Sequence, residues 1–251
     1  MKILVIQHLP VEHPGIFRDL LRRDGLIWDT VELDRGDGIP PLEPYAFMLV
    51  MGGPQDVWQE DVHPWLVAEK AAIRRFVVDM RRPYLGICLG HQLLAEAIGG
   101  RVGLSLSPEV GVMTVEKTVG GSQGILEGLA DRFTVLQWHS AEVQALPGDA
   151  RILAQSENCR VQAFQYRDHA FGLQFHIEIT DRTVPEWAAV PAYAKSLESM
   201  LGANALDRLQ AEVFTELPSI NANAEIIYQN LQMARCSAAW AFTPNAATTT
   251  V

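Results

Sequence analysis

The sequence is poor in cysteine, in basic residues and in long hydrophobic runs. Its three cysteines, Cys88, Cys159 and Cys236, are far apart and form no CxxC pair, so it predicts neither a disulfide framework nor a zinc ribbon. Lysine and arginine total 20 against 30 acidic residues, and they are scattered, which argues against a nucleic-acid-binding face. No apolar run approaches the ~18 residues of a membrane span, and the one after Met1 is too short for a signal peptide. These absences favour a protein of the reducing cytoplasm.

A phosphate-binding loop of the type G-x-x-x-x-G-K-[ST] is also absent, so nothing in the sequence indicates activation of an acceptor by ATP. We expect no cofactor. His8, Glu12 and His13 raise the question of a metal, but no helix or hairpin spacing holds them together as ligands. We expect no metal site there, and interpret this loop as shaping the mouth of a substrate site.

The chain has 251 residues, of which 48% are hydrophobic, enough for one large domain with one core. Strand and helix patterns alternate, which predicts an α/β fold with an open, mostly parallel sheet and helices on both faces. Helices are expected over 16–23, 64–80 and 91–98. The expected strands cover 3–9, 28–33, 46–51, 84–87, 101–105, 110–118, 133–138, 152–156, 160–166 and 171–179.

The character of the sequence changes at residue 183, after which apolar residues recur at helical spacing. We therefore expect a catalytic domain over 1–182 and a helical extension over 183–251 that packs on the same domain. Residues 237–251 carry no charge and no period, so this tail is predicted to fray unless a neighbour orders it.

The stretch Gly86-x-Cys88-x-Gly90 stands between a predicted strand and a predicted helix. It has the pattern of a nucleophile elbow with sulfur in place of oxygen, because glycines on both sides allow a tight turn that displays the side chain. The start of the helix favours a thiolate at this place. The alternative is that Cys88 is a small buried hydrophobic residue. We interpret Cys88 as a nucleophile because the residues that would support this role follow later in the sequence.

That context is the segment 171–179, which alternates as a strand does. Residues two apart on a strand project from the same face, so His176 and Glu178 are expected side by side. A cysteine nucleophile needs a histidine to move its proton, and the histidine needs an acid to fix its tautomer. Cys88, His176 and Glu178 would fill these three roles.

Three motifs in this order resemble the class I glutamine amidotransferases: Met-Gly-Gly-Pro at 51–54, Gly-Ile-Cys-Leu-Gly-His-Gln at 86–92 and Gln-Phe-His-x-Glu at 174–178. The resemblance covers roughly residues 1–182 and implies a flavodoxin-like fold with a Cys-His-Glu triad. Many members have proline between the histidine and the glutamate, where this chain has Ile177. A β-branched residue suits a strand, so the triad is not placed in doubt.

An oxyanion needs two N–H donors, and one comes from Leu89, the residue after the nucleophile. The resemblance assigns the second to Gly53. It also implies that the glutamine substrate contacts the glycine loop at Gly52, the amide of Gln92, and the backbone at His139 and Ser140. The competing interpretations are an ordinary turn for the glycines and a plain helix residue for Gln92.

The expected reaction is therefore attack by Cys88 on the side-chain amide of glutamine, followed by hydrolysis of a thioester. Three functions remain open. The chain is a glutaminase subunit that passes ammonia to a separate synthase, a stand-alone hydrolase or peptidase of γ-glutamyl compounds, or a binding or regulatory protein that keeps only the fold.

Overall fold

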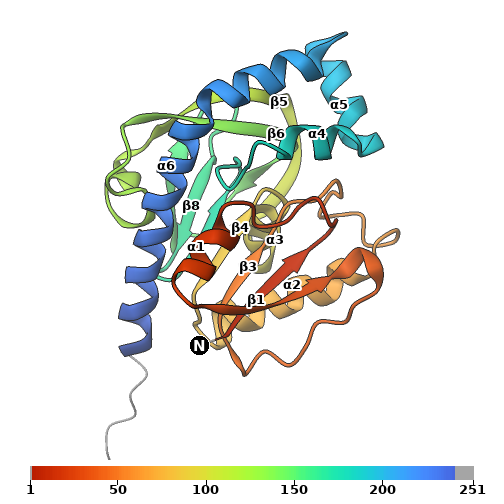
Figure 1. Cartoon of the computed structure of the whole chain (residues 1–251). Helices are drawn as coiled ribbons and strands as arrows, with labels where there is room; N and C mark the ends of the chain where they lie inside the picture. Colours follow the sequence, from red (N-terminus) through yellow and green to blue (C-terminus); the bar gives the residue numbers. More distant parts are fainter. Residues whose placement is uncertain (1, 241–251) are drawn as a thin grey trace, which may run out of the picture.

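The computed structural model describes residues 2–240, with side chains through residue 232. Most of the tail for which we predicted fraying, residues 241–251, lies outside the described residues, and the backbone of 237–240 continues the last helix. Figure 1 shows the arrangement of the elements. The strands are β1 (Lys2–Gln7), β2 (Ile27–Glu32), β3 (Tyr45–Val50), β4 (Tyr84–Ile87), β5 (Arg101–Lys117), β6 (Arg132–Ala145), β7 (Ala150–Gln155), β8 (Ala163–Tyr166) and β9 (Ala170–Leu173). The α-helices are α1 (Phe17–Arg23), α2 (Trp65–Arg74), α3 (Leu89–Ala97), α4 (Thr183–Ala188), α5 (Pro191–Leu201) and α6 (Ala205–Trp240).

The nine strands form one sheet in the order β2-β1-β3-β4-β9-β8-β7-β5-β6. The first five strands in this order are parallel, as the alternation of strands and helices predicts, whereas each pairing from β9 to β6 is antiparallel. The α/β fold class is confirmed, and the sheet is mixed. Parallel pairing of β4 with β9 sets Ile87 opposite Leu173, so the two chain segments that follow these strands emerge together.

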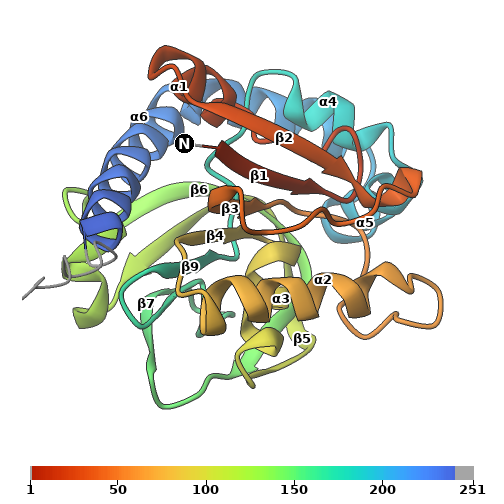
Figure 2. The ribbon, with the colours of Figure 1, turned by 90° about the horizontal axis from the view of Figure 1, so that it is seen from below.

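Helices cover both faces of the sheet, as expected. Figure 2 shows α2 and α3 on one side and α1, α4 and α6 on the other. Each layer buries its own hydrophobic cluster: Leu66 and Leu93 belong to one, and Phe17 and Ile227 belong to the other. The apolar faces of the helices therefore bury the central strands of the sheet, such as β1 and β4.

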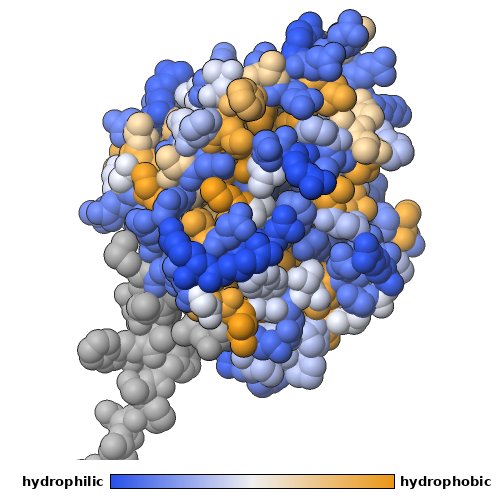
Figure 3. Space-filling view, viewed as in Figure 1, coloured by the Kyte–Doolittle hydropathy of each residue, from blue (hydrophilic) through white to orange (hydrophobic). Residues whose placement is uncertain are grey.

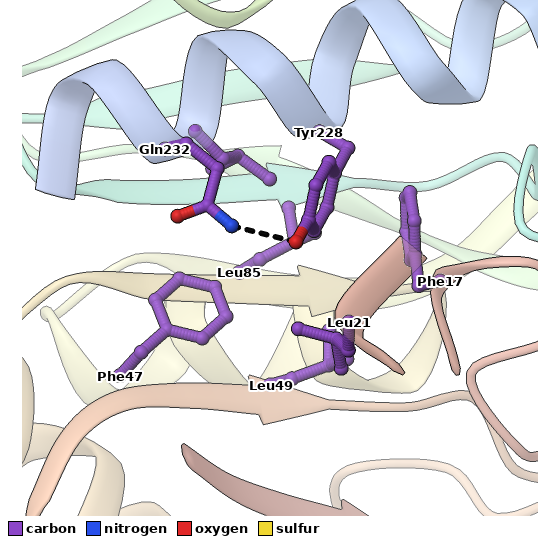
Figure 4. A pocket seen from close by; sticks show the side chains of 8 residues that line it. Phe17, Leu21, Phe47, Leu49, Leu85, Tyr228 and Gln232 are labelled. Carbon is purple, nitrogen blue, oxygen red and sulfur yellow. Dashed lines mark hydrogen bonds between the residues drawn. The ribbon is translucent and has the colours of Figure 1, made fainter. Parts of the chain in front are cut away.

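The last helix, α6, lies across the same sheet face as α1. Figure 4 shows Tyr228 and Gln232 of α6 above Phe17 of α1 and Phe47 of β3. The amide Nε2 of Gln232 donates to the hydroxyl of Tyr228 over 2.6 Å. On the outer face that carries α1 and α6, apolar side chains lie in separate patches among polar ones (Figure 3). No helix among residues 2–240 is long and apolar enough to cross a membrane.

Several strand predictions were wrong in their extent. The strand predicted over 133–138 is β6, which continues to Ala145, and the one predicted over 160–166 begins only at Ala163. The segment predicted as two strands over 101–105 and 110–118 is the single long strand β5, whose pairing with β6 shifts register between Leu104 and Glu109. The strand predicted over 171–179 ends at Leu173. Beyond it, His176 makes only an isolated antiparallel bridge to Leu136 of β6.

Candidate active site

Cys88 occupies the sharp corner between β4 and α3. Its backbone has φ 52° and ψ −104°, a conformation that side chains with a Cβ rarely adopt. The two flanking glycines are sterically required: a Cβ on Gly86 would lie 2.3 Å from the carbonyl oxygen of Gly90, and one on Gly90 would lie 2.2 Å from that of Val50. The corner is thus a nucleophile elbow in its geometry as well as in its sequence.

The structure brings Cys88, His176 and Glu178 together. Glu178 Oε1 lies 2.7 Å from His176 Nδ1, and Glu178 Oε2 accepts the Ile177 N–H over 3.0 Å. The Cys88 side chain lies close enough to the same imidazole to raise its pKa. His176 and Glu178 meet although they do not lie on a regular strand, because the carboxylate folds back onto the backbone between them.

The charges around His176 favour its imidazolium form. Burial lowers the pKa of His176, but Glu178 and the Cys88 side chain raise it by more, so the pKa lies well above its ordinary value. Trp187 of α4 packs edge-on against the ring, with 4.6 Å between ring centroids. The base is therefore held in one orientation and shielded from water.

Gly53 and Leu89, the expected oxyanion donors, are neighbours. A Cβ on Gly53 would lie 3.0 Å from Cδ2 of Leu89 and 2.8 Å from Cβ of His8, so only glycine fits there. Within residues 2–240, neither the Gly53 N–H nor the Leu89 N–H donates a hydrogen bond to another group. Both N–H groups are thus unengaged, as the oxyanion role predicted for them requires.

A pocket of about 110 Å³ opens beside Cys88, lined also by Gly53, Gln92, His139 and Ser140. The Gln92 amide donates to Gln174 Oε1 over 3.0 Å and to the Ala141 carbonyl over 3.2 Å, which ties α3 to β6 and to the segment after β9. These predicted residues therefore converge on one cavity.

Gly52 stands slightly apart from this cavity. It is not among the lining residues, and its carbonyl is bonded by Nδ1 of His8 over 2.8 Å. A Cβ there would instead meet Glu12 and His176. A substrate contact for Gly52 stays a prediction.

The sequence indicated neither the place of Tyr193 in the pocket wall nor its bond to Glu12, although Glu12 belongs to the loop expected to shape the substrate mouth. Tyr193 of α5 lines the pocket together with Ala192 and Ser196, although its helical spacing indicated only packing on the core or on another subunit. Glu12 is buried and accepts a hydrogen bond from the Tyr193 hydroxyl. Their partnership joins residues 181 positions apart, and no local pattern signals it.

His8, Glu12 and His13, which raised the question of a metal, do not face one another. His8 Nε2 lies 3.0 Å from Oε1 of Glu69, whereas Glu12 faces Tyr193. His13 Nδ1 accepts the Gly15 N–H over 3.0 Å. The three side chains thus serve three different partners.

A different trio, Glu109, His139 and Cys159, places its potential ligand atoms within 4.8 Å of one another. His139 Nε2 already lies 3.0 Å from Oε2 of Glu109, and Gln162 donates to the same oxygen over 2.6 Å. Burial raises the pKa of Cys159 to about 12, which disfavours the thiolate that a metal requires. The trio is best described as a hydrogen-bonded wall behind the pocket.

His91, next to the elbow, is completely buried and packs against Phe164 with 4.9 Å between ring centroids. Burial lowers its pKa to about 3. A histidine that stays neutral at every physiological pH packs the helix onto the sheet, so His91 does not compete with His176 for the role predicted for that residue.

Comparison with known proteins places this geometry in a family. The family model for "Glutamine amidotransferase class-I" matches residues 28–186. One subunit of a glutamine-hydrolysing GMP synthase from Sulfurisphaera tokodaii is 37% identical over 139 residues, which are 55% of this chain and 70% of that protein. A glutamine amidotransferase-like protein of Salmonella typhimurium is 30% identical over 189 residues, covering 73% of this chain and 78% of that protein.

Solved structures agree over almost the whole chain. A crystal structure of a glutamine amidotransferase from Thermotoga maritima has a TM-score of 0.83 and 29% identity, covering 92% of this chain and 97% of that one. One from Methylobacillus flagellatus has a TM-score of 0.82 and 28% identity, covering 93% and 94%. With the elbow cysteine and its histidine in place, these matches confirm the family that the motifs indicated: the chain belongs to the class I glutamine amidotransferases, which are cysteine-dependent enzymes.

Proposed function

We propose that the protein hydrolyses the side-chain amide of glutamine through a thioester on Cys88. The observation that carries this proposal is the position of Cys88, which stands on a strained elbow, lines the pocket and raises the pKa of the His176 imidazole. His176 is in turn oriented by Glu178 over 2.7 Å. This is the geometry that activates a weak nucleophile.

In the first half of the reaction, Cys88 Sγ attacks the amide carbonyl carbon and the carbonyl oxygen becomes an oxyanion. The N–H groups of Gly53 and Leu89 stabilise that charge. His176 Nδ1 is occupied by Glu178, so Nε2 carries the proton taken from the thiol. His176 gives this proton to the departing nitrogen, and ammonia leaves as the thioester forms.

In the second half, water enters on the side vacated by ammonia. His176 removes one proton from the water, whose oxygen attacks the thioester carbon. The carbon–sulfur bond breaks, glutamate leaves, and the proton returns to Cys88. Because the nucleophile must remain a free thiol, a reducing compartment such as the cytoplasm suits this chemistry.

The ammonia is used elsewhere, because the chain has no G-x-x-x-x-G-K-[ST] loop with which to activate an acceptor. The similar protein from Sulfurisphaera tokodaii is one subunit of a GMP synthase. We propose that this chain likewise delivers ammonia to a separate synthase.

The second candidate is a stand-alone hydrolase of γ-glutamyl compounds. It is favoured by α5, which follows the matched family segment and supplies Ala192, Tyr193 and Ser196 to the pocket wall. The chain thus supplies this part of the pocket wall from its own helix α5.

The test compares glutamine with a γ-glutamyl dipeptide as substrates for the wild-type protein, Cys88→Ala and the control Cys159→Ala. Cys159 is also buried but belongs to the Glu109 wall. We expect Cys88→Ala to lose all turnover and Cys159→Ala to retain it. Release of glutamate by Cys88→Ala at the wild-type rate would disprove the mechanism. Cleavage of the dipeptide faster than glutamine would favour the stand-alone hydrolase over ammonia delivery to a synthase.

A further inference from the structure

Glu12 is a buried carboxyl group that the proposed mechanism does not use. It lies in the loop after β1 and is 2% exposed. Its Oε1 accepts a hydrogen bond from the Tyr193 hydroxyl, whereas its Oε2 has no hydrogen-bond partner among the described residues. A buried carboxylate oxygen without a donor is costly, so its position calls for an explanation.

The unpartnered oxygen lies beside the proposed base. A Cβ placed on Gly52 would lie 2.5 Å from Glu12 Oε2 and 3.2 Å from Cε1 of His176. The carboxylate oxygen and the ring carbon therefore border the same small space, which Gly52 leaves open because it has no side chain. Since Nδ1 of His176 is bonded to Glu178, Glu12 approaches the ring at a different edge.

A carboxylate at that edge distinguishes the two protonation states of the ring. The Cε1–H bond lies between the two ring nitrogens and carries much of the positive charge when both are protonated, so a nearby anion stabilises imidazolium over imidazole. The reciprocal effect is present in Glu12. Burial raises its pKa, His176 and the Tyr193 hydrogen bond lower it, and the net shift is upward.

The charged neighbours of both groups are few. His176 faces Glu178, the Cys88 side chain and Glu12, with the uncharged Trp187 packed on its ring. Glu12 faces His176 and Tyr193, and the charges of Glu178 and His8 also act on its pKa. Burial and Glu12 raise the pKa of Tyr193 well above its ordinary value, so its hydroxyl keeps the proton that it donates.

We propose that Glu12, held by Tyr193, is a positioning residue that stabilises the imidazolium of His176 and through it the thiolate of Cys88. This inference rests on the proposed function, because it assumes that the cysteine and histidine work as a pair. Glu12 and Tyr193 both lie outside the segment 28–186 that matches the family model. The loop after β1 and the helix α5 are thereby parts of the catalytic apparatus rather than a covering for the core.

The test measures how readily iodoacetamide alkylates Cys88 at each pH, in the absence of glutamine. Reaction of Cys88→Ala is subtracted, so that only the thiolate of Cys88 is counted. We expect Glu12→Gln to move the start of alkylation to higher pH and the alkaline limb of kcat/KM to lower pH, each by about one pH unit. Tyr193→Phe keeps the ring but removes the hydrogen bond to Glu12 Oε1. It should move the start of alkylation and the alkaline limb of kcat/KM in the same directions as Glu12→Gln, but by less.

Glu96→Gln is the matched control. It removes a negative charge from α3, the helix that follows the nucleophile, but Glu96 is paired with Lys70. In this variant we expect the start of alkylation and the alkaline limb of kcat/KM to stay at the wild-type pH. If both moved as far as in Glu12→Gln, the effect would come from overall charge and not from Glu12.

A merely structural role for Glu12 makes a different prediction. Glu12→Gln and Tyr193→Phe would then lower Tm and raise KM while both pH limbs stayed in place, and that result would overturn the proposal. If Glu12→Gln does not fold, Tyr193→Phe decides alone by the same criterion. Alkylation requires no turnover, so this outcome is separate from any failure of glutamine hydrolysis.

Discussion

Replacing Cys88 by glycine should give a more stable protein than replacing it by alanine. The backbone at Cys88 has φ 52° and ψ −104°, outside the left-handed helical region that other residues tolerate. Holding a residue with a Cβ in such a conformation costs about 1–3 kcal/mol, and this position belongs at the upper end. Alanine keeps that strain, whereas glycine relieves it.

Two effects oppose the gain. Glycine loses about 1 kcal/mol more backbone entropy on folding than alanine does. It also lacks a methyl group whose burial contributes about 0.8 kcal/mol. Set against a strain of about 3 kcal/mol, these leave Cys88→Gly about 1 kcal/mol more stable than Cys88→Ala.

The assay is urea unfolding of both variants, with Ala95→Gly as the control. Ala95 is a buried residue of α3 in an ordinary helical conformation. There the same alanine-to-glycine change relieves no strain and should cost about 2 kcal/mol. If Cys88→Gly proves less stable than Cys88→Ala by as much as Ala95→Gly falls below wild type, the elbow stores no strain and the reasoning fails.

Two further predictions concern the surroundings of the site. Gly90→Ala should destabilise the protein by about 3 kcal/mol in urea unfolding, because its Cβ would lie 2.2 Å from the Val50 carbonyl oxygen. The control Gly148→Ala places its methyl group in open space and should change the stability little. Equal losses of stability in the two variants would contradict the steric argument. Burial lowers the pKa of His8, but the buried Glu69 raises it by more, so the pair stabilises the fold fully below about pH 6.5 and this part of the stability is lost as pH rises through the folded pKa. The difference in urea midpoint between wild type and Glu69→Gln should therefore shrink with rising pH, and a constant difference would speak against an ion pair.

The elbow could be predicted from the sequence because its determinants are local. Gly86 and Gly90 flank Cys88 within five residues, and the need for glycine on both sides follows from the tight turn itself. The fold class was equally accessible, since alternating strands and helices leave few parallel arrangements.

The meeting of Cys88 with His176 depends on more distant contacts. The registers of β4 with β9 and of Leu136 with His176 set it, whereas the sequence indicated the pairing only through the chemistry that a cysteine nucleophile needs and through the resemblance to a family. A spacing of two in the sequence suggested a regular strand at His176, but the segment turns away from β9 to bind β6. The Glu12–Tyr193 bond lies further beyond reach, because neither residue stands in a recognisable pattern.

The strand β6 explains why the base is rigid. Leu136 and His176 exchange both backbone hydrogen bonds, over 2.8 and 3.1 Å, so the histidine is tied to β6 at the moment the chain leaves β9. Two residues further along β6, Trp138 packs against Trp187, which in turn packs on the His176 ring. Backbone, carboxylate and indole thus fix the imidazole from three directions. A base held in this way needs no reorganisation when the proton moves, which is how a preorganised site lowers its barrier.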